Sequence, residues 1–201
     1  MELRDALTQI SEIRQQMART QVFRGYRSAT ALFSAVLAGA AACVQATWVA
    51  EPGRNIDRYV MLWGGVALVS ILVVGIEMAA RYVRTESALL REVTLLAAEQ
   101  FLPSLVAGAL ATYVLTHFAP QVTWVLPGLW AILFSLGVFA SRRLLPRATL
   151  WVAQYYLLAG LLCLTCGGTS ALAPWVMGAM FGAGQCLAAG VLYFSLERSH
   201  G

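Results

Sequence analysis

Six long apolar runs constrain the fold of this chain more than any other feature of its sequence. Each run is close to the roughly 20 residues that an α-helix needs to cross the hydrocarbon of a bilayer. Backbone groups in lipid must be hydrogen-bonded internally, and the runs lack the alternating pattern of a membrane β-barrel, so we expect helices. The expected spans are 28–49, 59–80, 95–117, 122–140, 150–167 and 174–196.

The composition supports a membrane protein. Of 201 residues, 59% are hydrophobic and only 12% are charged, whereas soluble domains carry about 25% charged residues. A soluble domain of this size could not hide so much apolar surface, so we expect the lipid bilayer to be a partner. The net charge of +4 then reflects topology and gives no indication of nucleic-acid binding.

The arginines predict the orientation. All fourteen basic residues are arginine, and twelve of them fall before the first span, in the loops 81–92 and 142–147, or at Arg198. Because cytoplasmic loops carry the excess of basic residues, the sequence predicts an all-α protein with six transmembrane helices and both termini in the cytoplasm. Four tryptophans at the expected outer ends resemble an aromatic belt: Trp48, Trp63, Trp124 and Trp175.

The two flanks of the expected bundle over 28–196 are more polar. Residues 1–27 lack the early apolar core of a secretory signal and predict an amphipathic helix on the cytoplasmic side. That helix would lie on the membrane or on a cytoplasmic protein partner, and 197–201 would form a cytoplasmic tail. The apolar stripe of the N-terminal helix follows helical spacing: Leu3, Leu7, Ile10, Ile13 and Met17.

Glu99 is the main candidate for a functional site inside the membrane. It lies in the third expected span, about 10 Å from the cytoplasmic edge at 1.5 Å per residue. Gln100 follows it, and Pro103 removes a backbone hydrogen bond one turn later. A free carbonyl beside a carboxylate suits a cation or proton. The alternative is that Glu99 is protonated, or is paired with an arginine from the loop.

A polar site in the cytoplasmic half of the bundle would include other residues. Glu77 precedes Arg81 by four residues, which favours an ion pair. It also lies on a helix antiparallel to that of Glu99, at similar depth, so the two carboxylates could instead face one cavity. The complete candidate site is Glu99, Gln100, Glu77, Gln154 and Tyr155.

Two short motifs have structural as well as functional interpretations. Cys163 and Cys166 have the C-x-x-C spacing of membrane thiol oxidoreductases, but no outer loop contains a second cysteine pair, and cysteine also packs as a small apolar residue. Gly178 and Gly182 form a G-x-x-x-G motif that would pack helices within the bundle or in a homodimer. No catalytic motif, cofactor site or metal site is evident.

Four runs carry a family resemblance: RGYRSAT, GIEMAAR, EQFLPSLVAG and LPGLWAILFSLGVFAS. They resemble an uncharacterised family of small six-helix bacterial inner-membrane proteins. The resemblance implies a multi-pass protein of the bacterial inner (plasma) membrane, and it brings no established activity.

Three functional classes therefore remain open. The polar site favours a small-solute or proton-linked transporter or channel. The N-terminal helix favours a non-catalytic sensor or scaffold that engages a cytoplasmic partner. The cysteine pair indicates a membrane thiol oxidoreductase, which is the only one of the three that would be an enzyme.

Overall fold

The computed structural model describes residues 28–49, 51–84 and 88–197; most of these residues are helical, and none of them forms a strand. The prediction of an all-α fold is therefore confirmed for this part of the chain. The amphipathic helix predicted over 1–27 and residues 198–201 of the predicted tail lie outside the described residues.

Five helical segments are long and apolar enough to cross a membrane, and Thr149–Thr165 is a shorter apolar helix. Each expected span coincides with one of the six. The main helices are α2 (Ser28–Trp48), α3 (Ile56–Arg84), α4 (Ala88–Phe118), α5 (Leu126–Ala140), α6 (Thr149–Cys166) and α8 (Gly184–Leu192). Short 3-10 helices lie between them: η1 (Pro120–Val125), η2 (Ser141–Arg143) and η3 (Gly168–Leu172).

The connection between α3 and α4 is more helical than expected. The sequence predicts a turn around 81–92, but α3 continues to Arg84 and α4 begins at Ala88. The stretch from Glu77 to Leu102 contains neither glycine nor proline and is rich in Ala, Leu, Glu and Arg. Since these residues favour helix, both helices extend beyond their apolar segments.

The last segment changes helix type along its length. After α7 (Pro174–Met177) comes a π-helical stretch, η4 (Gly178–Ala183), then α8, and then a second π-helical stretch, η5 (Tyr193–Glu197). The wider π turns alter which face each residue presents. Glycines at 178, 182 and 184 lower the α-helical preference around η4.

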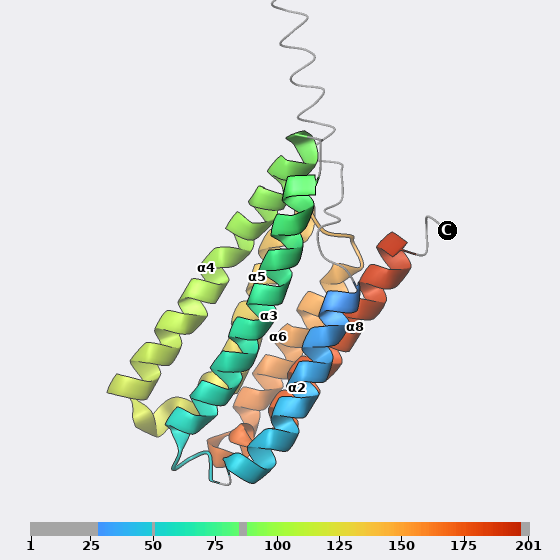
Figure 1. The fold of residues 1–201 in the computed structure, drawn as a ribbon. Coiled ribbons are helices and arrows are strands. Elements are labelled where there is room, and N and C mark those ends of the chain that lie inside the picture. The colour runs from blue at the N-terminus through green and yellow to red at the C-terminus, as the bar shows by residue number, and fades with distance from the viewer. Residues whose placement is uncertain (1–27, 50, 85–87, 198–201) are drawn as a thin grey trace, which may run out of the picture.

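The helices lie side by side as an elongated bundle (Figure 1). α5 packs between α4 and α6, α6 packs on α8, and α2 packs on α8, η4 and α3. α3 and α4 form one edge of the bundle. α4 packs less extensively on α3 than on α5. The start of α2 and the end of η5 lie at the same end of the bundle (Figure 1).

α5 and α6 cross most closely at two glycines. A Cβ atom on Gly160 would lie 2.7 Å from the Gly128 carbonyl oxygen, and one on Gly128 would lie 2.8 Å from the Gly160 oxygen. Only residues without a side chain allow two backbones to approach this closely. The two glycines therefore fix the position of α6 against α5.

α4 packs on α5 through one narrow strip. Phe101 lies against Gly137, and a Cβ on Gly108 would be 3.7 Å from Leu133 of α5. The Trp130 indole Nε1 donates a hydrogen bond to Thr112 Oγ1 at 2.8 Å. None of the residues in the most apolar 18-residue window of α4 is buried. Most of the helix therefore faces away from the bundle.

Candidate functional site

Glu99 lies on the outward face of α4. Its side chain is exposed. It precedes Gly108 by nine residues, which at about 100° per residue places it about half a turn from the strip that contacts α5. The carboxylate is therefore near the centre of the exposed arc of the helix and points away from the bundle interior.

The two neighbours of Glu99 identified from the sequence lie on different sides of α4. Pro103 is exposed and cannot donate to the Glu99 carbonyl, its i−4 partner in an α-helix. Gln100 is half-buried, and its Oε1 is buried with no hydrogen-bond partner among the described residues. The Glu99 carboxylate is thus available for contacts beyond α4, but Gln100 does not share its face.

Glu77 is connected to α2. The Thr30 hydroxyl donates a hydrogen bond to the Glu77 carboxylate, Thr30 is buried, and Glu77 is half-buried. The side chain of Arg81 lies outside the described part of the chain, so the predicted ion pair stays a prediction. Glu77 stabilises the contact between α2 and α3.

The remaining polar candidates lie on α6. Gln154 is exposed, whereas the Tyr155 hydroxyl donates to the Ala179 carbonyl at 3.1 Å. The next residue, Tyr156, is buried, and its hydroxyl is 3.4 Å from the Phe181 carbonyl. Both accepting carbonyls belong to the π-helical η4, so these tyrosines hold α6 to the last segment.

The structure therefore does not gather the five predicted residues around one cavity. Glu99 and Gln154 face outward from two helices that flank α5, Glu77 contacts α2, and Tyr155 contacts η4. No group of three or more His, Cys, Asp or Glu side chains in the described residues is placed to hold a metal ion.

The cysteine and glycine motifs lie in contacts within the chain. The Cys163 side chain is buried and forms no disulfide with a described cysteine, and the side chain of Cys166 is outside the described part of the structure. A Cβ on Gly178 would be 2.8 Å from Ala42 Cβ, and one on Gly182 would be 3.8 Å from the Ala35 carbonyl. The glycine motif thus faces α2 of the same chain.

Sequence reasoning missed a buried polar cluster formed by Gln45, Trp63 and the Leu172 carbonyl. The Trp63 Nε1 donates to Gln45 Oε1, and the Gln45 Nε2 donates to the Leu172 oxygen, both at 2.7 Å. Gln45 is 0% exposed and Trp63 is 3% exposed. Assigning Trp63 to the aromatic belt was therefore wrong. A lone amide in the apolar run 28–49 is the signal that could have indicated this cluster.

Tyr59 lies one turn before Trp63 on the same face of α3. Its ring stacks on Trp130 of α5, with centroids 6.2 Å apart. Its hydroxyl is buried and has no hydrogen-bond partner within the described structure. The interior here is filled by aromatic rings, which pack α3 against α5.

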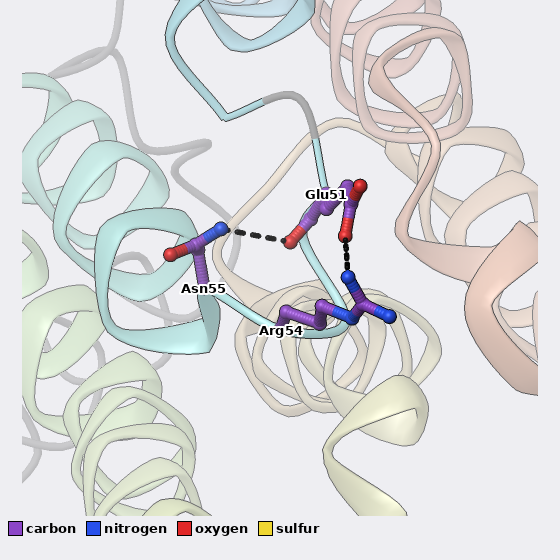
Figure 2. A network of polar contacts seen from close by, with 3 residues as sticks. All are labelled: Glu51, Arg54 and Asn55. Carbon is purple, nitrogen blue, oxygen red and sulfur yellow. Dashed lines mark hydrogen bonds and ion pairs between the residues drawn. The ribbon is translucent and has the colours of Figure 1, made fainter.

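An open depression of about 600 Å³ lies where the α2–α3 loop meets the start of the last segment. Figure 2 shows the loop: Arg54 pairs with Glu51 at 3.0 Å, and the Asn55 amide donates to the Glu51 carbonyl at 3.3 Å. Both charged side chains are well exposed, so this pair adds little stability. The depression is lined by Ala46, Val49, Glu51, Pro52, Gly53, Arg54, Thr169, Ala173 and Pro174.

Comparisons with protein-family models, with curated proteins and with solved structures found no match to this chain. The family resemblance of the four sequence runs therefore stays a hypothesis.

Proposed function

We propose that this chain is a non-catalytic membrane scaffold that associates laterally with another membrane-embedded chain. The observation that carries the proposal is the position of Glu99 at the centre of the outward face of α4. A carboxylate costs about 2.5–3.5 kcal/mol on insertion scales at the midpoint of a spanning helix, and less at the depth expected for Glu99. A neighbouring chain that supplies a hydrogen-bond donor would offset part of that cost.

The packing of the bundle interior supports the same proposal. Several buried polar side chains there bond to one another or to the backbone, as in the Gln45–Trp63 cluster. Phe134, Tyr156 and Phe181 fill the space between α5, α6 and η4, with the Phe134 and Tyr156 ring centroids 4.6 Å apart. The exposed carboxylate is thus better placed for a partner than for a solute.

The proposal includes the location and the topology. The scaffold would be a multi-pass protein of the bacterial inner membrane, with both termini in the cytoplasm as the arginine distribution predicts. Residues 1–27 would engage a cytoplasmic protein or the membrane surface, which would link that partner to whatever α4 binds.

A pair of measurements tests the scaffold against the transporter. A photo-reactive amino acid in place of the exposed Leu102 of α4 should cross-link to another membrane chain in intact membranes, whereas one in place of Ile76 on the exposed face of α3 should not. Purified protein in liposomes should show no ion or proton flux above empty liposomes. A flux that Glu99→Gln abolishes would instead support the transporter.

A further inference from the structure

Two buried polar atoms where α4 meets the end of α5 have no hydrogen-bond partner among the described residues. One is Oε1 of Gln100 on α4, and the other is Oγ of Ser141, the first residue of η2. Ser141 is only 3% exposed. Buried polar atoms in folded proteins almost always bond to a protein group or to an ordered water. Each of these two atoms therefore needs a partner that the described side chains and backbone do not supply.

The packing of α4 on α5 places Gln100 and Ser141 at a similar level in the bundle. The two helices are antiparallel neighbours (Figure 1). A Cβ on Gly108 of α4 would contact Leu133 of α5. Gln100 is eight residues before Gly108, and Ser141 is eight residues after Leu133. Equal steps in opposite directions along two antiparallel helices lead to the same level.

The contact of Phe101 with Gly137 gives a slightly larger separation along the helices. Measured from this pair, Ser141 lies about three residues beyond the level of Gln100, which corresponds to about 4.5 Å at 1.5 Å per residue. The side chain of a helical residue leans toward the N-terminus of its helix. Gln100 therefore leans toward the end of α4 on which η2 packs. A glutamine side chain and one water molecule together span this separation.

Both residues also lie on the sides of their helices that face each other. Residues three or four apart are neighbours on one face of a helix. Ser141 is four residues after Gly137, which contacts α4. Gln100 is three residues after the buried Ala97, which packs with Leu144 just beyond η2. The two unpartnered atoms therefore lie at one corner, between α4 and the end of α5.

We propose that one water molecule binds between Gln100 and Ser141. The Ser141 hydroxyl donates a hydrogen bond to the water, and the water donates one to Oε1 of Gln100. These bonds satisfy both buried atoms, and a buried water typically has two to four polar partners. The bridge joins α4 to the end of α5. Together with the Thr112–Trp130 hydrogen bond, it holds the rotation of α4 that turns Glu99 outward. It requires no partner chain, so it is independent of the scaffold proposal.

A water fits this corner better than a direct hydrogen bond or a divalent cation does. Gln100 Oε1 and Ser141 Oγ do not bond to each other, since neither has a partner among the described residues. An amide oxygen and a hydroxyl are both neutral, whereas Ca²⁺ and Mg²⁺ favour sites that contain carboxylates. The Glu99 carboxylate is exposed on the face of α4 that is opposite the contact with α5. It is therefore not a ligand at this corner.

Substitution distinguishes a bridged pair from two unsatisfied atoms by the sign of its effect on stability. With the water in place, Ser141→Ala and Gln100→Leu each remove a hydrogen bond, so each should raise the unfolding equilibrium constant about twofold to tenfold. If the two atoms had no partner, either substitution would lower that constant, because an unsatisfied buried polar atom is destabilising. Ser135→Ala is the matched control. Its buried hydroxyl donates to the Ala153 carbonyl at 2.8 Å, so its removal should raise the constant.

Two further measurements test the bridge itself. The double variant, Gln100→Leu with Ser141→Ala, should be no less stable than the less stable single variant, because the two substitutions remove the same bridge. A crystal structure of the full-length chain, at a resolution that shows ordered waters, should contain a water within hydrogen-bond distance of both atoms. That structure uses the unaltered chain, so it decides the question even if a variant does not fold.

Four results would overturn the inference. Greater stability of Ser141→Ala would show that its hydroxyl has no partner, and additive losses in the double variant would show that the two residues act separately. A direct bond between Gln100 and Ser141 in the crystal structure would leave no place for the water. Stabilisation of the parent chain by Na⁺ relative to choline, absent in Ser141→Ala, would identify a cation at the corner instead.

Discussion

The crossing of α5 and α6 predicts a large difference between two chemically identical substitutions. In Gly160→Ala the new Cβ would lie 2.7 Å from the Gly128 carbonyl oxygen, 2.8 Å from Ile132 Cγ1 and 3.2 Å from Ala131 Cβ. The carbonyl belongs to the backbone and cannot rotate away, so α5 and α6 must separate. Overpacking of this kind costs about 1–3 kcal/mol, whereas replacing glycine with alanine in a helix contributes about 0.8–1 kcal/mol of stability.

Gly64→Ala on α3 is the matched control, because a Cβ there meets nothing within 4 Å. Both variants gain the same helix preference, so the difference between their free energies of unfolding isolates the overpacking cost. We expect Gly160→Ala to be less stable than Gly64→Ala by about 1–3 kcal/mol. Unfolding in mixed detergent micelles, followed by circular dichroism, measures both. Equal stabilities would refute the close crossing at Gly160.

The remaining predictions concern the buried amide and the topology. Gln45→Leu should destabilise the bundle by about 1–3 kcal/mol because it leaves a buried indole N–H and a buried carbonyl without partners. Gln154→Leu, at an exposed position, is the control and should change stability by less than about 0.5 kcal/mol in the same unfolding assay. Similar losses of stability for both variants would contradict the buried hydrogen bonds of Gln45. Reporter fusions after Gly201 should indicate the cytoplasm, and insertions at Gly53 should indicate the outside. A C-terminal reporter on the outer side of the membrane would exclude the predicted topology with both termini in the cytoplasm.

The helices of this fold were predictable because its apolar runs are long enough to cross a bilayer. Lipid requires long apolar runs and internally bonded backbones, so the length and composition of each run identify a helix. The sequence predicted a turn over 81–92, but α3 extends to Arg84 and α4 begins at Ala88. The residues beyond the two apolar runs favour helix, and the prediction did not take this preference into account. The π-helical stretch η4 was missed because its hydrogen-bond pattern depends on contacts with α2 and α6.

The direction in which each polar side chain points was not predictable. Depth follows from counting residues along a helix, but direction requires knowledge of which face packs. α4 is apolar around most of its circumference, so its hydrophobic pattern does not distinguish the α5 side from the outside. Trp63 illustrates the same problem. Its position near the end of an expected span is typical of an aromatic belt, but its side chain points inward and is buried beside Gln45.

Glu77 and Glu99 show how two carboxylates at similar predicted depth come to have different roles. Glu77 accepts a hydrogen bond from Thr30, so its carboxylate has a partner within the chain. Glu99 could join Glu77 at a common solute site only if α4 turned by about half a turn. That rotation would break the Thr112–Trp130 hydrogen bond and the contact of Phe101 with Gly137. A neighbouring chain could contact Glu99 without any rotation of α4. Lateral association therefore requires less rearrangement of the bundle than a shared solute site would.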